Sequence, residues 1–211
     1  MICLSISSRE QLLNIPEGSQ YMLELRFDLI GEDPGQILPL TRSSAGVIAT
    51  CRPDKLSGDE QVRILGQAAA EGVDYLDIEL DAPDAQRERL LQLGRKYHTG
   101  LIISWHDFEK TPDTQRLLEL LNECYHYGAD VAKIACMVRS PEDAARLLGL
   151  YQYPGKKVVL GMGDLGRITR IAAPLLGAPF TFASPDQHGA TAPGQMTPGD
   201  MEIVQSYLSA Q

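Results

Sequence analysis

Long hydrophobic runs and an excess of positive charge are both missing from this chain of 211 residues. The longest apolar stretches fall far short of the roughly 20 residues that a membrane-spanning helix needs, so we expect no membrane contact. Lys and Arg number 19 against 28 Asp and Glu, which gives a formal net charge of −9. This charge argues against a nucleic-acid partner, although a local group of arginines can still bind a small anionic substrate.

Cysteine pairs at metal-binding or redox spacing are also missing. The four cysteines, Cys3, Cys51, Cys124 and Cys136, form no CxxC pair, and no histidine stands at zinc-finger spacing from them. We therefore predict reduced thiols and no metal site, in a cytoplasmic protein without a signal peptide. No glycine-rich loop for a nucleotide phosphate follows the early strands, so we predict no cofactor.

Short apolar runs alternate with helical patterns along the whole chain. Eight of these runs predict parallel strands that are buried on both faces. They are residues 2–7, 21–28, 46–51, 74–80, 100–105, 130–135, 157–162 and 179–184. Eight repeats without a linker predict one α/β domain over residues 1–211, a closed (β/α)8 TIM barrel. An open doubly wound sheet is the alternative, but the glycine-rich loop typical of that fold is missing.

Proline and glycine mark the ends of several predicted helices. Pro112 precedes one helical pattern and Gly128 closes it, and Ser140 is the predicted N-cap of a helix that begins at Pro141. The remaining predicted helices cover residues 58–72, 84–98, 163–176 and 198–208.

Lys133 lies in the middle of an apolar strand-like run, residues 130–136. Burial disfavours a charged ammonium, so such a lysine either pairs with a carboxylate or loses its proton. A neutral amine attacks carbonyl carbons, which makes Schiff-base chemistry the functional interpretation. A structural ion pair is the alternative, and Lys133 alone does not decide between the two.

Other polar residues stand where the predicted strands end, which is the catalytic face of such a barrel. Glu24, Arg26 and Asp28 alternate in the second strand, so we place all three on one face at the interior mouth. An interior salt-bridge network without a substrate is the alternative for these three. Arg52 follows the third strand, and His106 ends the apolar run of the fifth.

The last two strands add further candidates. Met162 ends the seventh strand, and Arg170 follows it within the next helical segment. The polar loop 184–195, rich in Gly and Pro, is expected to act as a lid or a substrate clamp. Lysine with histidine suits imine formation and proton transfer, and arginines suit a carboxylate or phosphate. The residues together predict a metal-free Schiff-base enzyme for a small anionic carbonyl compound.

Six sequence blocks, ELRFD, TCR, SWHDFEKTP, DVAKIA, MGDLGRITR and APGQ, resemble the type I 3-dehydroquinate dehydratases, the Schiff-base class of the shikimate pathway. The resemblance extends from the second strand to the last loop. It implies a hydro-lyase that converts 3-dehydroquinate to 3-dehydroshikimate in aromatic amino acid biosynthesis. It also implies that Lys133 forms the imine, that His106 is the general acid and base, and that Arg170 pairs with the substrate carboxylate.

The same resemblance implies further substrate contacts from polar and apolar positions. Glu24, Arg26 and Arg52 match residues that bind the ring hydroxyls, Gln195 and Thr191 belong to the closing loop, and Met162 and Phe182 match apolar walls. Thr191 stands where many members have serine, and both side chains carry a hydroxyl.

Leu56 departs from the family pattern. Many members carry a glutamate four residues after the arginine of the third strand, where this chain has Leu56. Either Asp54, Asp59 or Glu60 supplies the carboxylate from a shifted loop, or the carboxylate is dispensable.

Other functions and partners remain open. A class I aldolase also uses a barrel lysine, but it needs phosphate-binding loops after the last two strands. A catalytically silent barrel that binds a metabolite is a further alternative. The sequence leaves open a homodimer, and a fusion to or association with another shikimate-pathway enzyme.

Overall fold

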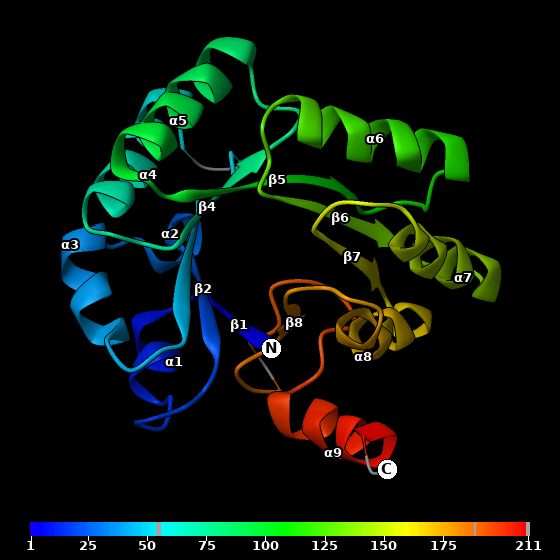
Figure 1. Cartoon of the computed structure of the whole chain (residues 1–211). Helices are drawn as coiled ribbons and strands as arrows, with labels where there is room; N and C mark the ends of the chain where they lie inside the picture. Colours follow the sequence, from blue (N-terminus) through cyan, green and yellow to red (C-terminus); the bar gives the residue numbers. More distant parts are fainter. Residues whose placement is uncertain (54–55, 188, 210–211) are drawn as a thin grey trace.

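Eight parallel strands with helices outside them form a nearly closed TIM barrel, which confirms the predicted fold class (Figure 1). The computed structural model describes residues 1–53, 56–187 and 189–209. The strands are β1 (Ile2–Ile6), β2 (Met22–Arg26), β3 (Gly46–Thr50), β4 (Tyr75–Glu79), β5 (Gly100–Asp107), β6 (Val131–Met137), β7 (Lys157–Met162) and β8 (Thr181–Ala183). They pair in the order β7-β6-β5-β4-β3-β2-β1-β8.

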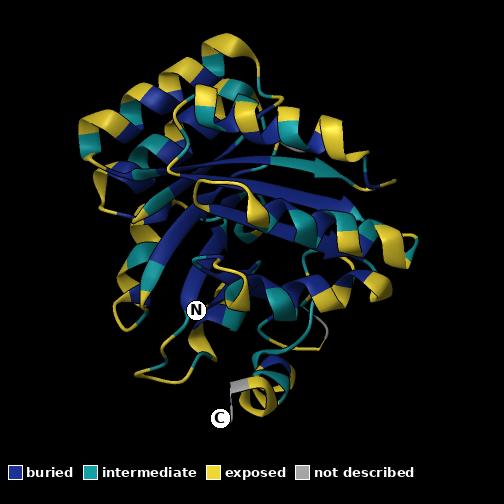
Figure 2. Cartoon of the chain, turned by 45° about the vertical axis from the view of Figure 1, so that its right-hand side comes forward, coloured by how far each residue is buried: buried dark blue, intermediate teal, exposed yellow. Residues whose placement is uncertain are grey.

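The helices cover the strands on the outside and turn their polar faces to solvent (Figure 2). They are α1 (Arg9–Leu13), α2 (Phe27–Ile30), α3 (Pro34–Ile37), α4 (Gly58–Ala70), α5 (Asp84–Tyr97), α6 (Thr114–His126), α7 (Pro141–Gly149), α8 (Arg167–Leu175) and α9 (Pro198–Ser209). The prediction of Ser140 as an N-cap is confirmed, because its side chain accepts from Asp143 N in a capping box. No described helix combines the length and apolar character that a membrane span requires.

The second strand is shorter than its sequence predicts. It ends at Arg26, and the next residues form the single helical turn α2, which buries Phe27 and ends at Gly31 with a φ of 72°. The prediction that Asp28 continues the strand face of Glu24 and Arg26 is therefore wrong. Asp28 nevertheless stays close, because both of its oxygens accept hydrogen bonds from Arg26, at 3.0 and 2.7 Å.

The barrel interior consists of an apolar floor below a polar layer. Since side chains alternate along a strand, each strand contributes to both levels. The floor contains Met22, Ile48, Ile102, Val131, Val158 and Phe180, all buried. Two residues further along their strands lie Glu24, Thr50, Ser104 and Lys133, which are also buried. The strand spacing therefore stacks ionisable groups directly on a hydrophobic base.

Helix α8 connects the two ends of the strand order. Gly161 N in β7 donates to Thr169 Oγ1 at 2.6 Å, and Thr181 Oγ1 in β8 donates to the carbonyl of Arg170 at 2.9 Å. These contacts fix the first turns of α8 between β7 and β8. They also place Arg170 at this seam, with its side chain buried.

Candidate active site

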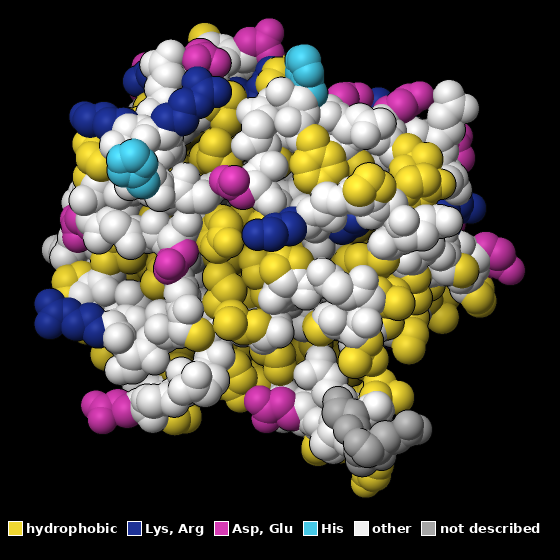
Figure 3. All heavy atoms as spheres, viewed as in Figure 1, with side chains coloured by type: hydrophobic (Ala, Val, Ile, Leu, Met, Phe, Trp, Pro, Cys, Tyr) yellow, Lys and Arg dark blue, Asp and Glu magenta, His cyan; other side chains and the backbone are white. Residues whose placement is uncertain are grey.

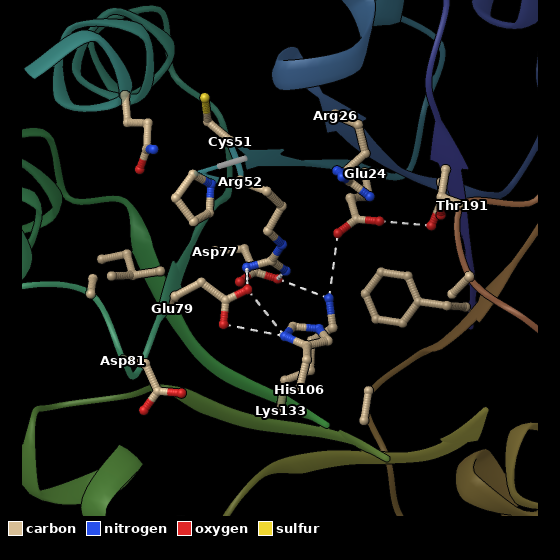
Figure 4. A pocket seen from close by; sticks show the side chains of 18 of the residues that line it. Glu24, Arg26, Cys51, Arg52, Asp77, Glu79, Asp81, His106, Lys133 and Thr191 are labelled. Carbon is tan, nitrogen blue, oxygen red and sulfur yellow. Dashed lines mark hydrogen bonds and ion pairs between the residues drawn. The ribbon is translucent and has the colours of Figure 1, made fainter. Parts of the chain in front are cut away.

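A pocket of about 680 Å³ opens at the carboxyl ends of the strands (Figure 4). Ten of the residues that the sequence selects lie on its wall. They are Glu24, Arg26, Arg52, His106, Lys133, Met162, Arg170, Phe182, Thr191 and Gln195. Residues that are up to 171 positions apart in the sequence are thus brought to one cavity by the closure of the barrel.

Lys133 lies in the polar layer with its amine enclosed. Its Nζ is 2.9 Å from Asp77 Oδ2 and 3.4 Å from Glu24 Oε1, and it stands 4.2 Å from the centre of the Phe182 ring. The residue is 5% exposed. A buried lysine either pairs with a carboxylate or loses its proton, and in this structure Lys133 pairs with two carboxylates.

The two carboxylates that face Lys133, those of Glu24 and Asp77, also accept hydrogen bonds from hydroxyl groups. Glu24 accepts from Ser5 Oγ at 2.7 Å and from Thr50 Oγ1 at 3.0 Å. Burial alone would raise the pKa of Glu24, but Lys133 and Arg26 lower it below its ordinary value. Both carboxylates are therefore ionised at neutral pH.

Asp77 joins the lysine to the rest of the network. It accepts from Ser104 Oγ at 2.5 Å and from Arg52 at 3.1 Å. Burial opposes its ionisation, yet Arg52 and Lys133 hold the pKa of Asp77 far below its ordinary value. Arg52 also contacts Ser104 at 3.1 Å and pairs with Glu79. The arginine that was expected to bind substrate hydroxyls is thus fixed by three neighbours.

His106 lies on β5 and faces the same cavity as Lys133 (Figure 4). Its Nδ1 is 3.1 and 3.2 Å from the two oxygens of Glu79. Burial and the charge of Arg52 lower the pKa of His106 below its ordinary value, although Glu79 acts in the opposite direction. The imidazole is therefore neutral at pH 7. Because a carboxylate only accepts, Nδ1 carries the proton and Nε2 is left free to act as a base.

Arg170 is a buried cation on α8. It is 2% exposed, its NH1 donates to the carbonyl of Phe182 at 3.3 Å, and its Nε has no hydrogen-bond partner among the residues that the structure describes. Burial lowers the pKa of Arg170 to about 10, which still leaves it charged at neutral pH. No carboxylate in the described part of the chain is within ion-pair distance of it. Such an uncompensated charge is unfavourable unless an anion enters the pocket.

The loop after β8 folds back onto the rim of the pocket. Gly163 N donates to the carbonyl of Pro193 at 3.1 Å, and Gly194, at a φ of 77°, packs so closely on Gly163 that a side chain would clash. Gln195 Nε2 then reaches Ser5 Oγ at 3.3 Å and Thr191 Oγ1 at 3.2 Å. The glycine therefore allows the loop to place an amide over the cavity.

Two acidic residues that contact Lys133 or His106, Asp77 and Glu79, were missed from the sequence. Both lie in the predicted fourth strand, two positions apart, within an otherwise apolar run. The period-two argument that selected Glu24 and Arg26 applies equally to this pair and would have found them.

Two of the acidic candidates beside Leu56, Asp59 and Glu60, do not line the pocket. Leu56 is half-buried and packs on the outer core. Asp59 pairs with Arg89 on the surface, Glu60 is exposed, and neither lines the cavity. Of the alternatives stated for the missing glutamate, Asp59 and Glu60 therefore do not supply a carboxylate to the site. The third candidate, Asp54, lies outside the described residues.

The fold and the pocket define a TIM-barrel enzyme whose site combines a buried lysine with a neutral histidine. A family model, Type I 3-dehydroquinase, matches residues 2–210, and the chain belongs to this family. A 3-dehydroquinate dehydratase from Methanococcoides burtonii is 33% identical over 210 residues, covering 94% of this chain and 89% of the relative. The resemblance stated from the sequence blocks is thereby confirmed.

Solved structures agree with this assignment. The crystal structure of 3-dehydroquinate dehydratase from Geobacillus kaustophilus has a TM-score of 0.84 at 27% identity, covering 99% of this chain and 91% of that one. A structure of dehydroquinate dehydratase and shikimate dehydrogenase from S. pombe has a TM-score of 0.79 at 22% identity, covering all of this chain and 44% of that one. At that identity the second likeness concerns the fold alone.

Proposed function

We propose that this protein dehydrates 3-dehydroquinate to 3-dehydroshikimate through an imine on Lys133. The observation that carries the proposal is the arrangement of one enclosed amine, one neutral imidazole and one uncompensated arginine around a single cavity. A substrate with both a ketone and a carboxylate complements these three groups. Membership of the type I 3-dehydroquinase family supports the same substrate.

The first step is condensation of Lys133 with the ketone. An ammonium cannot attack, so Nζ must first give a proton to a base in the pocket, and neutral His106 can accept it. The amine then adds to the ketone carbon, and the carbonyl oxygen leaves as water after protonation. The product is an iminium, whose positive charge lies near the carboxylates of Asp77 and Glu24.

The second step is elimination. The iminium draws electrons from the adjacent carbon more strongly than a ketone does, so Nε2 of His106 can remove a proton there and form an enamine. The enamine then expels the hydroxyl of the next carbon as water, with the same imidazolium returning the proton. Hydrolysis of the resulting conjugated imine frees the enone product and Lys133. General acid–base help of this kind contributes about 10²–10⁴-fold.

The remaining pocket residues bind and orient the substrate in this scheme. Arg170 pairs with the carboxylate through charge-assisted hydrogen bonds. Arg26 and Gln195 bind ring hydroxyls, and Met162 and Phe182 form the apolar wall. Neither a metal nor an organic cofactor enters any step.

The cellular setting is part of the proposal. We place the protein in the cytoplasm, acting in the shikimate pathway on a small-molecule substrate. A homodimer and an association with another enzyme of that pathway remain compatible with it.

The test is an ultraviolet assay for the enone product, combined with borohydride trapping during turnover. We expect product formation from 3-dehydroquinate and a stable adduct on Lys133. Lys157 is the internal control, because it is also buried but its amine caps the carbonyls of Tyr153 and Gly155, at 2.7 and 2.8 Å. Turnover without an adduct, or an adduct on Lys157, would contradict the imine on Lys133.

A further inference from the structure

Glu79 stands between Arg52 and His106 at the end of β4 (Figure 4). Its two carboxylate oxygens are 3.1 and 3.2 Å from Nδ1 of His106, and one of them also pairs with Arg52. Across the described ranges of the chain, no other carboxylate lies within ion-pair distance of His106. The carboxylate is itself held in place, since Arg52 is anchored on Asp77 and Ser104.

We infer that Glu79 is the positioning residue of His106, which fixes the Nδ1–H tautomer and directs Nε2 toward the reacting atoms. The inference rests on the proposed function, because it assigns how the proposed acid and base is held. A histidine that must first take and then return a proton needs one defined tautomer and one defined ring orientation. A carboxylate at Nδ1 supplies both.

The location of Glu79 distinguishes it from the loop carboxylates that the sequence suggested. It is a strand residue, so its backbone is fixed by the pairing of β4 with β5, where Glu79 stands opposite Ser104. Leu56, in the segment between β3 and α4, packs on the outer core and has no carboxylate to offer. A support on a strand holds an imidazole more rigidly than a support on a surface loop does.

A purely structural role for Glu79 would be to balance the charge of Arg52. Arg52 already has Asp77 at 3.1 Å and Ser104 at 3.1 Å, so it does not depend on Glu79 for a partner. The two roles predict different results for the imidazole. Loss of a charge-balancing residue lowers stability and leaves the tautomer unchanged, whereas loss of a positioning residue changes the tautomer.

Nitrogen-15 NMR of the histidine ring tests the inference without turnover. In the wild-type protein we expect the Nδ1–H tautomer at His106. In Glu79→Gln we expect a mixture of tautomers and a lower pKa of His106, because Arg52 and Lys133 then repel the imidazolium with only Asp77 to oppose them. Identical tautomer and titration in both proteins would overturn the inference.

Kinetics provide the second readout. Glu79→Gln should lower kcat about 10²-fold with KM within a factor of about three, since the group acts on the proton transfer rather than on binding. Glu79→Asp keeps the negative charge on a side chain that is one methylene shorter, so its kcat should lie between those of Glu79→Gln and the wild-type protein. It also serves as the second variant if Glu79→Gln does not fold.

Matched carboxylate variants complete the design. Glu60→Gln and Asp59→Asn remove one charge each outside the pocket, and both should retain wild-type kcat. Full activity in Glu79→Gln, or an equal loss in either of these variants or in Asp54→Asn, would contradict the assignment. If the wild-type protein shows no turnover of 3-dehydroquinate, the proposed function fails, while the tautomer measurement still decides the role of Glu79.

Discussion

The two sides of the pocket differ in how the charge of a buried cation is balanced. On the side of β2 to β6, Lys133 contacts two carboxylates, and each carboxylate has further hydrogen-bond donors. On the side of α8 and β8, Arg170 is more deeply buried, yet a backbone carbonyl at 3.3 Å is its only hydrogen-bond partner in the described residues. On the first side the described carboxylates balance the charge of Lys133, whereas on the second side no described carboxylate balances Arg170, and the proposed substrate would supply one.

The paired charges around Lys133 suit preorganisation of a catalytic site, whereas the unbalanced charge of Arg170 suits the binding of an anion. In the proposed mechanism, the fixed charges around Lys133 and His106 set the geometry and protonation of the reacting groups before substrate arrives. Among the described residues Arg170 has no compensating charge, which lowers the stability of the empty protein, and in the proposed function the entry of a carboxylate removes this penalty. Substitutions on the two sides should therefore have opposite effects on stability, which the following experiments examine.

The largest effect is expected for Lys133→Ala. Without the amine no imine forms, so turnover should fall by roughly 10⁴-fold or more. Stability should fall as well, because Glu24 and Asp77 lose the cation that they share. The assay for enone product and a thermal melt measure the two changes, with Lys157→Met as the control for removal of a buried lysine. Substantial turnover by Lys133→Ala would exclude the imine mechanism.

Arg170→Met should weaken binding while stabilising the empty protein. Loss of the charged donors should raise KM about 10²-fold. Replacement of an uncompensated buried charge by an apolar side chain should raise the free energy of unfolding by about 1 kcal/mol. Arg167→Met is the control, because that residue lies one turn earlier on α8, is exposed and pairs with Asp164 at 2.8 Å. A less stable Arg170→Met protein with unchanged KM would refute the contrast between the two sides.

The same contrast explains what the sequence could predict. Lys133 stood out because a single charge interrupts an apolar strand, and strand order then placed it with His106 and Arg52 at one end of the barrel. Arg170 was selected from its place after the seventh strand, and only the family resemblance implied that it pairs with a substrate carboxylate. Its lack of a carboxylate depends on the packing of α8 between β7 and β8, which no local pattern reveals.

The predictions that the structure corrects are those that depend on tertiary contacts. Asp28 reads as the continuation of a strand, but burial of Phe27 and the left-handed Gly31 turn the chain into α2. The acidic residues after Arg52 were candidates because they lie close in the sequence to the position of the missing glutamate. Closeness in the sequence does not place a loop side chain in the pocket. The contact between Glu79 and His106 joins the adjacent strands β4 and β5, and the alternation of residues along one strand does not show which side chains meet across two strands.

Acidification should remove activity before it removes the fold. The pKa of His106 lies below its ordinary value, so kcat/KM should be constant above about pH 6.5 and fall at lower pH as the base becomes protonated.

The pKa values of Asp77, Glu24 and Glu79 are lowered, so their stabilising contribution is present above about pH 4 and is lost only as pH falls through their folded-state values. Parallel pH profiles of kcat/KM and of melting temperature measure both. Coincident loss of activity and fold would show that His106 is not the group that limits activity.

The smallest effect is expected for Gln195→Ala, in the loop that covers both sides. Its amide contacts Ser5 at 3.3 Å and Thr191 at 3.2 Å, so it joins the loop to the hydroxyl that supports Glu24. Loss of one neutral hydrogen-bonding group should raise KM by about tenfold at most and leave the imine chemistry intact. Gln115→Ala, on the exposed face of α6, is the matched control. If Gln195→Ala lowered kcat as much as Glu79→Gln, the loop would belong to the preorganised side of the pocket rather than to its cover.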